Sequence, residues 1–544
     1  MGEWGKTMDF HFASAFERIS DAIPNRTALI CDGQARTWAE FDDRAARFAD
    51  VLSAHGLGVG SKVGIYLHNS NEYQEAQYGI FKIRGCPINV NYRYKADELV
   101  YLLDNSDAEA VVFQASYAMR IWEIRDRLPK VKLFVQVNDG TEALLKGALD
   151  FERALRSATP QPRIERSPDD VYMLYTGGTT GMPKGVMYPG GEFAQFFVAM
   201  GAQAQERTPP QNLAELGEWV KASAAAPVSL AACPLMHGTG CWLGSFAPML
   251  MGGTVVTTSK LGLDPDLMWG LVESHRVTDM VIVGDAFARP LLAALDEAAR
   301  RGNPYDVSSL KQITSSGVMW SQEVKQGLLK HGDFILADIM GSSEGGMGSS
   351  VTTREVAAGT AKFQLNEGVK VFTEDDRQVQ PGTGEIGLVG TSGFVPLGYY
   401  KDPEKSARTF REIGGVRYSF PGDFATVEAD GSITLLGRGS VCINTGGEKV
   451  FPEEVEEAVK RHDEVEDCLV VGVPDERFGE RIVAVASLKD EDRTVAEADL
   501  IRFTQDHLSG YKVPRQVLWV DTVRRAPNGK ADYKWAKNHA LANA

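Results

Sequence analysis

The stretch YTGGTTGMPKG at residues 175–185 has the composition of an anion-binding loop. Its glycines let backbone N–H groups turn toward an anion. Hydroxyl donors and one positive charge complete the set, which comprises Thr176, Gly177, Gly178, Thr179, Thr180, Gly181 and Lys184. A glycine-rich turn without a ligand is the alternative, but it has no need of so many hydroxyls. The residue types therefore predict a phosphate-binding loop.

The loop does not follow the pattern of kinase-like nucleotide hydrolases. That pattern, G-x-x-x-x-G-K-[ST], leads directly into a helix. Here Pro183 precedes the lysine, Gly185 follows it, and residues 186–189 (VMYP) favour a strand. We therefore expect phosphate binding in a different structural setting.

Apolar strands alternate with amphipathic helices on both sides of this loop. Residues 37–40 (TWAE) form a capping box, and apolar residues then recur at helical spacing until Gly56. Strands are expected at KVGIYL, CPINVN, GTVVTT, DMVIVG and KQITSS. This β-α-β alternation predicts an α/β protein with a large N-terminal domain of layered, mostly parallel sheets.

The pattern changes near residue 420. FATVEADGSITLLG reads as two strands joined by Asp430-Gly431, which is a strong hairpin signal. Shorter helices and strands follow. We therefore predict a large N-terminal domain at 1–437 and a small C-terminal α/β domain at 438–544.

Composition narrows the function classes. The 544 residues carry a net charge of −16, which argues against nucleic acid and anionic membrane as default partners. Residues 222–259 contain no charged side chain, but prolines and paired glycines interrupt them, so no membrane span is expected. The six cysteines form no C-x-x-C pair, which indicates reduced thiols and a cytoplasmic protein.

Seven further motifs, in order, resemble those of the adenylate-forming superfamily, which includes acyl-CoA synthetases, firefly luciferase and peptide-synthetase adenylation domains. The segments are KIRGCPINVNYRY, PLMHGTG, SSG, GSSEGG, YSFPGDFATVEADGSITLLGR, INTGGEKVFPEEVE and PNGK. The resemblance covers nearly the whole chain. It implies that the loop at 175–185 holds the β- and γ-phosphates of ATP, which leave as pyrophosphate.

The resemblance also implies roles for individual residues in ATP binding. Glu344 would bind Mg²⁺, Asp423 would accept the ribose hydroxyls, and Arg438 would contact phosphate or ribose. Taken alone, these residues could also be a solvated glutamate, a turn cap and a boundary salt bridge. The remaining ATP contacts that it implies are Gly317, Met340, Gly341 and Ser343.

Lys530, in the PNGK motif, is implied as the lysine that stabilises the charge developing between carboxylate and α-phosphate. Gly446, Gly447 and Glu448 would line the CoA channel; a turn entering a helix is the alternative for the two glycines. Ser440 occupies the position of the hinge between the domains, where the family usually has Asp or Lys.

The acyl pocket is expected beside His237, Gly238, Gly240 and Trp242, inside the charge-free stretch. His237 would line the pocket and act on the carboxylate, although a hydrogen-bonded core histidine is the alternative. Met340 departs from the family, which usually has an aromatic residue there to stack on adenine. We expect sulfur contacts to replace that stacking.

These observations predict an ATP- and Mg²⁺-dependent acyl-CoA synthetase that first adenylates a hydrophobic acid and then transfers the acyl group to CoA. The acid would be a fatty acid or a bulky acid such as a steroid side-chain acid. The segments GRGSVCINTGGEK and VGDAFARP resemble those of actinobacterial-type synthetases that act on steroid side-chain or other bulky acids. An adenylation enzyme for an amino or aryl acid, and a non-catalytic nucleotide sensor, are the alternatives. A homodimer is left open.

Overall fold

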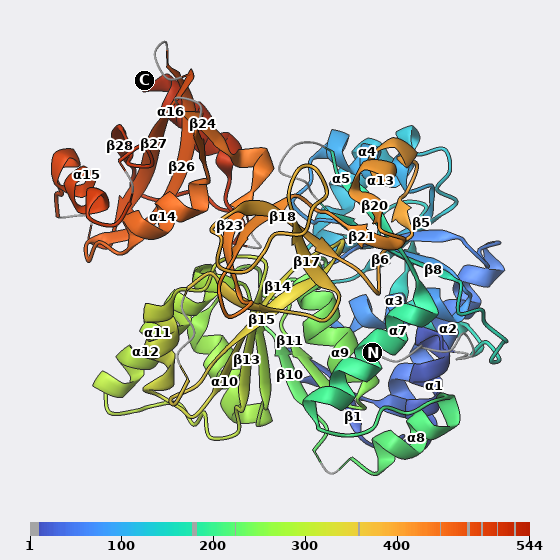
Figure 1. Ribbon diagram of the computed structural model, residues 1–544. Helices are drawn as coiled ribbons and strands as arrows, with labels where there is room; N and C mark the ends of the chain where they lie inside the picture. Colours follow the sequence, from blue (N-terminus) through green and yellow to red (C-terminus); the bar gives the residue numbers. More distant parts are fainter. Residues whose placement is uncertain are drawn as a thin grey trace. The chain divides into compact units, whose positions relative to one another are not determined.

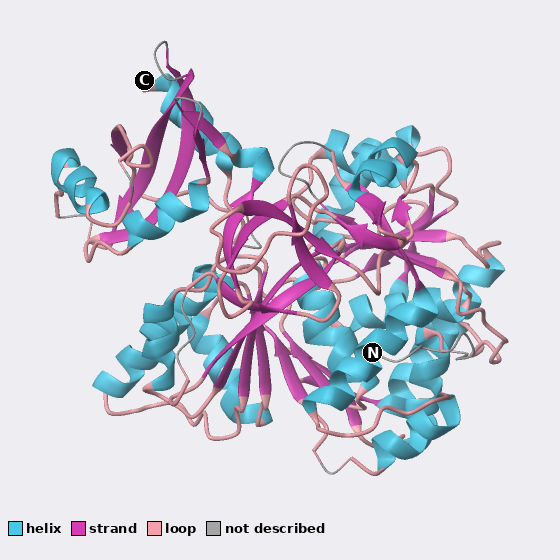
Figure 2. Cartoon of the chain, in the orientation of Figure 1, coloured by secondary structure: helices cyan, strands magenta, loops and turns pink. Residues whose placement is uncertain are grey.

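The computed structural model describes residues 10–176, 182–223, 225–356, 360–445, 448–475, 479–490, 493–508, 510–526 and 529–543. Helices and strands alternate along the chain, and the predicted α/β class is confirmed (Figures 1 and 2). Two compact units are formed. The first comprises residues 1–345, 351–358 and 393–412, and the second comprises 346–350, 359–392 and 413–544.

A mostly parallel sheet forms one half of the first unit. Its strand order is β2 (Gln34–Thr37), β1 (Thr27–Cys31), β11 (Thr254–Thr257), β10 (Val228–Ala231), β12 (Asp279–Ile282), β13 (Gln312–Ser316) and β14 (Ile335–Ser342). Only β2 is antiparallel to its neighbour. Its strands are short apolar runs, as expected where helices cover a parallel sheet. Helices α10 (Pro265–His275), α11 (Gly284–Arg300) and α12 (Gln322–Leu329) share a buried core with it.

A second parallel sheet lies in the same unit. Its strand order is β4 (Cys86–Asn89), β3 (Lys62–Tyr66), β5 (Ala108–Gln114), β6 (Leu133–Val137) and β7 (Leu149–Asp150). Helices α2 (Trp38–Ala54) and α3 (Asn71–Lys82) pack against one another beside it. The predicted capping box is confirmed, because Thr37 and Glu40 exchange hydrogen bonds at the start of α2.

The glycine-rich loop connects the two strands of a hairpin. Strands β8 (Val171–Thr176) and β9 (Lys184–Pro189) pair antiparallel, and β19 (Gly398–Tyr399) adds to the far side of β9. The expected strand after the loop is therefore confirmed. A loop between two antiparallel strands differs from one that leads into a helix, which agrees with the absence of the kinase-like motif.

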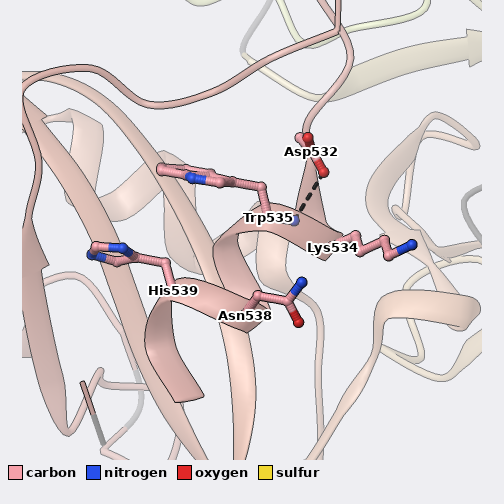
Figure 3. Close-up of a pocket in the computed structure, with 5 residues that line it drawn as sticks. All are labelled: Asp532, Lys534, Trp535, Asn538 and His539. Atoms are coloured by element: carbon pink, nitrogen blue, oxygen red, sulfur yellow. Dashed lines mark hydrogen bonds between the residues drawn. The ribbon is translucent and has the colours of Figure 1, made fainter. Parts of the chain in front are cut away.

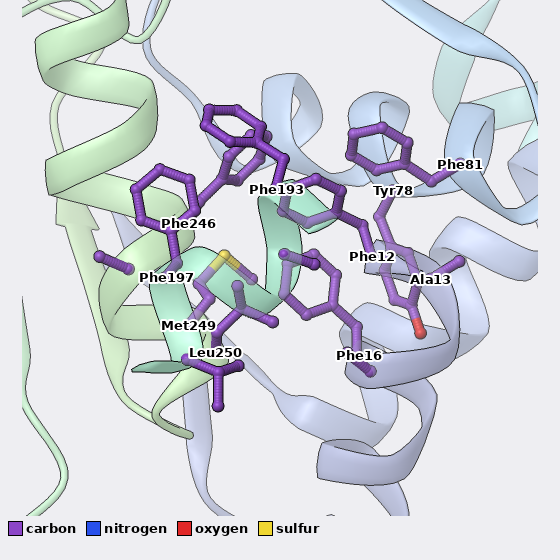
Figure 4. Packing of buried hydrophobic residues seen from close by; sticks show 14 of the residues in the cluster. Phe12, Ala13, Phe16, Tyr78, Phe81, Phe193, Phe197, Phe246, Met249 and Leu250 are labelled. Atoms are coloured by element: carbon purple, nitrogen blue, oxygen red, sulfur yellow. The ribbon is translucent and has the colours of Figure 1, made fainter. Parts of the chain in front are cut away.

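An aromatic core packs the N-terminal helix α1 (Phe12–Ala22) into the first unit (Figure 4). Phe12 stacks on Phe81 with ring centroids 4.9 Å apart, and its centroid lies 4.5 Å from that of Phe246. Phe193 and Phe197 come from α7 (Gly190–Ala204). Large buried rings dominate the hydrophobic contribution to stability here.

The charge-free stretch folds as strand, loop, short helices and strand, and not as one continuous helix. After β10 the chain enters π-helix η3 (Thr239–Phe246), which continues as α9 (Ala247–Leu250) and ends at β11. Prediction did not anticipate the π-helical form, which often marks functional sites. Among the described helices, none has the length and apolar character needed to cross a membrane.

The second unit contains mainly antiparallel strands. The predicted hairpin is confirmed as β22 (Asp423–Val427) and β23 (Ile433–Arg438), with Gly431 at φ +84° in the turn. A further sheet has the order β25 (Glu448–Val450), β24 (Ile443–Thr445), β27 (Gly479–Leu488) and β26 (Val465–Asp475), with β28 (Gln516–Trp519) paired to β27. Helices α14 (Pro452–Lys460), α15 (Glu497–Gln505) and α16 (Tyr533–Ala542) share its valine-rich cores.

The division into compact units does not follow a single cut in the sequence. Residues 359–392 and 413–437 group with the C-terminal sheet in the second unit. The functional boundary at residue 438, which concerns movement between domains, stays a prediction.

Candidate active site

Asn89, at the end of β4, holds the base of the glycine-rich hairpin. Its side-chain amide donates to the Tyr175 carbonyl at 2.8 Å and to the Met236 carbonyl at 2.7 Å, and its carbonyl accepts from the Tyr175 N–H at 2.7 Å. Asn89 therefore ties the end of β8, just before the loop, to the PLMHGTG segment. The two segments expected to bind ATP and acid are thus joined by one half-buried amide.

The two ends of the glycine-rich loop face each other. Thr176 is paired with Lys184 in the β8–β9 ladder. The Lys184 ammonium group donates to Asp402 Oδ2 at 2.7 Å, and this contact lowers the pKa of the Asp402 carboxyl. The predicted loop residues Gly177, Gly178, Thr179, Thr180 and Gly181 lie outside the described residues.

Glu344 lies in the turn between β14 and β15 (Gly345–Thr352) and is half-buried. Its Oε1 accepts a hydrogen bond of 2.7 Å from the hydroxyl of Tyr399, the last residue of β19. The neighbouring Ser343 carbonyl accepts from the Tyr188 hydroxyl at 2.9 Å. Tyrosines from two strands of the hairpin sheet therefore fix the turn that carries the predicted metal ligand.

Within the described residues, no group of three or more His, Cys, Asp or Glu side chains could hold a metal ion. Mg²⁺ commonly uses one or two carboxylates together with substrate phosphates and water, so a multi-residue cage is not required. Glu344 provides one carboxylate whose orientation is fixed by Tyr399. The donor set fits Mg²⁺ held chiefly by the nucleotide.

His237 stands at the entrance to the π-helix and is half-buried. The backbone N–H of His237 donates to the Pro234 carbonyl at 3.2 Å, and the His237 backbone carbonyl accepts from the Cys241 backbone N–H at 2.9 Å. On the next turn, the Trp242 indole N–H donates to the Tyr172 hydroxyl at 2.9 Å. The backbone around His237 is thus fixed by short-range hydrogen bonds and by the aromatic core.

The two glycines beside His237 have different surroundings. A Cβ on Gly238 would lie 3.3 Å from Leu174 Cδ2 and 3.4 Å from Trp242 Cε3, which are side-chain contacts. A Cβ on Gly240 would meet the Pro234 carbonyl oxygen, which is backbone and cannot move aside. Gly240 therefore has no room for a side chain, because the backbone passes close by. Its place in the acyl pocket stays a prediction.

The expected adenine-contact segments lie next to the acyl segment. Gly317 follows β13 at φ +93°, and the nearest atom to a Cβ placed there would be Thr239 Oγ1 at 3.6 Å. Met340 is buried in β14, which pairs with β13 in parallel register. Gly341 follows it in the same strand. The first unit therefore gathers Gly317, Met340 and the PLMHGTG segment around the ends of neighbouring strands.

In the second unit, the predicted ribose and hinge residues share one hairpin. Asp423 at the start of β22 is paired with Arg438 at the end of β23. The Gly439 N–H donates to the Gly422 carbonyl at 3.0 Å, and Ser440 then lies in a 3₁₀ turn, Gly439–Val441. The chain beyond Arg438 therefore leaves the sheet directly at the predicted hinge.

Lys530 is exposed and follows a tight turn. The Gly529 N–H donates to the Ala526 carbonyl at 2.8 Å, the Ala526 N–H donates to the Lys530 carbonyl at 2.8 Å, and Gly529 has φ +72°. The CoA-channel residues Gly446 and Gly447 lie outside the described residues, between β24 and β25; Glu448 begins β25.

A hollow of about 450 Å³ is formed on helix α16 (Figure 3). Its lining residues are Asp532, Lys534, Trp535, Asn538 and His539. The rings of Trp535 and His539 stack with centroids 5.7 Å apart, whereas Lys534 points the other way in the close-up. The hollow contains none of the predicted site residues, and we assign it no role in the reaction.

With this geometry in place, comparison with known proteins decides the family. Residues 16–400 match the AMP-binding enzyme family, and residues 454–530 match the AMP-binding enzyme C-terminal domain. The chain belongs to the AMP-binding enzyme family. The predicted superfamily is confirmed.

Curated relatives in this family match over nearly their full length. A 3-oxocholest-4-en-26-oate–CoA ligase of Rhodococcus rhodochrous is 41% identical over 98% of this chain and 96% of the relative. A medium/long-chain-fatty-acid–CoA/3-oxocholest-4-en-26-oate–CoA ligase of Mycolicibacterium smegmatis is 40% identical over 99% and 100%. The predicted enzyme class is confirmed as an AMP-forming acid–thiol ligase, whose reactants include ATP, Mg²⁺ and CoA.

Solved structures share the fold. The anthranilate CoA ligase AuaEII in complex with anthranoyl-AMP matches with a TM-score of 0.84 at 22% identity, over 98% of each chain. ATP-bound MatB from Rhodopseudomonas palustris matches with a TM-score of 0.80 at 23% identity, over 97% of this chain and 98% of that one. These similarities support the predicted α/β architecture.

Sequence reasoning missed Asn89, Tyr399 and Asp402 as site residues. Asn89 lies in the CPINVN segment, which was interpreted as structural. Tyr399 and Asp402 lie in GYYKDPEKS, a segment far from the loop in sequence that β19 brings onto β9. The contacts of Tyr399 and Asp402 become visible only when β19 is paired with β9. For Asn89, a polar residue within the otherwise apolar start of CPINVN was a signal in the sequence.

Proposed function

We propose that this ligase activates a bulky hydrophobic carboxylic acid, with a steroid side-chain acid as the first choice and a medium- or long-chain fatty acid as the second. The observation that carries this proposal is the 41% identity, over 98% of the chain, to a ligase named for 3-oxocholest-4-en-26-oate. The Mycolicibacterium relative is named for both acid classes. The uncharged stretch at 222–259 suits either acid.

In the first half-reaction, the acid carboxylate attacks the α-phosphate of ATP, giving acyl-AMP and releasing pyrophosphate. The β8–β9 hairpin loop and Lys184 hold the β- and γ-phosphates during this step. Glu344 holds Mg²⁺, which neutralises phosphate charge when bound. Asn89 keeps the loop and the PLMHGTG segment in register, so that carboxylate and α-phosphate meet in a defined orientation.

Two residues of the second unit complete adenylation. Asp423 accepts the ribose hydroxyls, and Lys530 stabilises the charge that develops between the carboxylate and the α-phosphate. Rotation about Ser440 then replaces Lys530 with the Gly446–Glu448 segment, which lines the path of the CoA thiol. The thiol attacks the acyl carbonyl, the bond to AMP breaks, and the thioester leaves with AMP as the second product.

His237, Gly238 and Trp242 form the wall that contacts the acid. Gly238 supports this role, because its missing side chain faces Leu174 and Trp242 rather than backbone. His237 lies next to it and is the one histidine in residues 222–259. In this arrangement His237 orients the carboxylate while the apolar neighbours contact the hydrocarbon.

A panel of acids tests the proposal. Purified enzyme receives ATP, Mg²⁺ and CoA together with steroid side-chain, long-chain, short-chain, aryl or amino acids, and pyrophosphate and acyl-CoA are quantified. We expect kcat/KM to be highest for steroid side-chain acids and next highest for medium- and long-chain fatty acids. Preference for an aryl or amino acid would favour the alternative adenylation function. ATP binding without pyrophosphate release would favour a nucleotide sensor.

We further propose that the enzyme acts in the cytoplasm, where ATP and CoA are available, and that its partners are its three substrates. Five cysteines, Cys31, Cys86, Cys233, Cys241 and Cys468, are free and buried. Burial raises the pKa of the thiols of Cys86, Cys233 and Cys241 to about 12, which suits unreactive structural cysteines. Whether the enzyme forms a homodimer is a matter for measurement of its mass in solution.

A further inference from the structure

A second lysine lies beside the lysine of the glycine-rich hairpin. Lys405, from helix α13 (Pro403–Thr409), has its ammonium nitrogen 5.1 Å from the centroid of the Tyr399 ring. The Lys184 ammonium nitrogen is 5.8 Å from the same centroid. The hydroxyl of that ring donates to Glu344. Tyr399 therefore contacts two cations and the predicted metal ligand at once.

The positive charge of Lys405 has less compensation from nearby carboxylates than the charges of Lys184 and Lys401 have. Lys184 pairs with Asp402 at 2.7 Å and Lys401 pairs with Asp107 at 2.8 Å, whereas no carboxylate among the described residues lies within 4 Å of the Lys405 ammonium nitrogen. Burial and then the charge of Lys184 lower the pKa of Lys405, while Glu344 and Asp402 oppose that shift. A half-buried cation in this setting costs free energy that only a further anion would recover.

The position of Lys405 in its helix is also unfavourable for a structural lysine. It is the third residue of α13, and positive charge near a helix N-terminus is repelled by the helix dipole. Asp402 caps the helix by accepting from the Lys405 N–H at 3.0 Å, so it is shared between the cap and Lys184. Fold stability alone therefore does not explain a cation here.

We propose that Lys405 is a second cationic ligand of the leaving pyrophosphate, acting with Lys184, and that Tyr399 is the positioning residue for both lysines. This inference rests on the proposed assignment of the β8–β9 loop to the ATP phosphates. A departing pyrophosphate carries more negative charge than one lysine can neutralise. The ammonium groups of Lys184 and Lys405 both lie beside the Tyr399 ring, whose hydroxyl donates to Glu344. They place positive charge near Lys184, at the end of the loop from which pyrophosphate would leave.

Calorimetric titration with inorganic pyrophosphate, without added metal, tests the inference on the full-length enzyme. Replacing Lys405→Met removes the charge and keeps most of the side-chain volume. We expect pyrophosphate affinity to fall about 10-fold, the effect of losing one charge-assisted contact. AMP affinity should stay within about twofold, because AMP lacks the two phosphates that leave. Lys405→Arg should recover most of the pyrophosphate affinity.

Lys401→Met is the matched control. Lys401 also lies over a tyrosine ring, 5.3 Å from the centroid of Tyr400, but its ammonium group pairs with Asp107. This variant should bind pyrophosphate as the wild type does. Tyr399→Phe keeps the ring and should also retain pyrophosphate affinity, whereas Tyr399→Leu should lose it to the extent that Lys405→Met does.

Three outcomes overturn the inference. If Lys405→Met binds pyrophosphate as tightly as the wild type does, Lys405 is not part of the pyrophosphate site. The proposed function would still stand in that case, because the wild-type enzyme binds pyrophosphate. An equal fall in AMP and pyrophosphate affinity would indicate a structural role. Wild-type enzyme that fails to bind pyrophosphate at all would overturn the phosphate assignment of the loop together with this inference.

Discussion

The two lysines expected to act on ATP from the two units are held in contrasting ways. Lys184 begins a strand of a three-stranded sheet, its side chain is 31% exposed, and its ammonium group is paired with Asp402. Lys530 follows a tight turn and is exposed. Lys184 therefore has a sheet, an ion pair and an aromatic ring around it. Lys530 directly follows Gly529, whose backbone has the left-handed φ of +72°.

The difference matches the work proposed for each lysine. A group that holds phosphates gains from being fixed before substrate arrives, because the cost of ordering it is met during folding. A group that acts in one half-reaction and then leaves needs few contacts that would have to be broken. The paired, half-buried position of Lys184 and the exposed position of Lys530 thus suit two different roles in one reaction.

The strongest test of this contrast is Lys530→Ala. Adenylation should fall on the order of 10²–10³-fold, as when one preorganised charge donor is removed, while thioester formation from supplied acyl-AMP should persist. Both half-reactions are followed separately by pyrophosphate release and acyl-CoA formation. Lys534→Ala, which removes another exposed lysine from the same unit, should leave both rates unchanged. Equal loss of both half-reactions would contradict the division of labour.

Gly240→Leu should damage the firmly held region itself. Its side chain would press on the Pro234 carbonyl, so we expect a loss of about 3 kcal/mol in the free energy of unfolding. Gly238→Ala meets only side chains, with Leu174 Cδ2 at 3.3 Å having to shift slightly, and should instead change discrimination between bulky and short acids by about 10-fold. Urea unfolding and kcat/KM across acids separate the two effects. Normal stability with altered acid preference in Gly240→Leu would support the place of Gly240 in the acyl pocket.

Acid should weaken the first unit through His11. Burial, and next the charge of Arg166, lower its pKa to about 3, while Asp170 opposes the shift. Because the folded state binds this proton less readily than the unfolded state, stability is lost as pH falls from about 6.5 toward 3. Between pH 7 and 5 the loss attributable to His11 should be about 2 kcal/mol.

The measurement for His11 compares urea unfolding of wild type and His11→Asn at pH 7 and 5. The wild-type Nδ1 accepts the Ala13 N–H at 3.1 Å and caps α1, and asparagine can replace that cap. The variant should therefore lose less stability on acidification than the wild type does. An identical loss in both proteins would show that other groups control acid sensitivity.

The smallest effect is expected at the predicted hinge. Ser440→Pro fixes φ and removes a backbone donor, so rotation between the two half-reactions should slow. A single round of pyrophosphate release should persist, while steady-state thioester synthesis falls about 10-fold. Ser440→Ala is the control and should turn over normally. Unchanged steady-state synthesis in the proline variant would remove Ser440 from the hinge.

Much of the fold followed from local pattern. The capping box at Thr37, the Asp430-Gly431 hairpin and the strands around the glycine-rich loop are all short-range features, and each is present where expected. The π-helix was missed because its form depends on packing of Phe246 and Trp242 into a core assembled from distant segments. Hydrophobic spacing alone does not distinguish it from a short α-helix.

For the candidate site, too, residues in local motifs were predicted and residues that are distant in sequence were missed. Motifs located Lys184 and Glu344, but the side chains that hold them, Tyr399 in β19 and Asp402 at the N-cap of α13, lie more than fifty residues beyond Glu344 in the sequence. Gly240 is a second case, since its residue type does not reveal that backbone lies where its side chain would stand. Both misses concern through-space neighbours, which residue type does not specify.

The π-helix at Thr239–Phe246 bears on how selectivity could diverge during evolution. A π-helix contains more residues per turn than an α-helix, so loss of one residue can be absorbed by tightening to α-helical geometry. Strands β10 and β11 on either side would then keep their parallel register. Descendants of this enzyme could therefore reshape the wall beside His237 by gaining or losing single residues, a route to new acids that leaves the nucleotide-binding scaffold undisturbed.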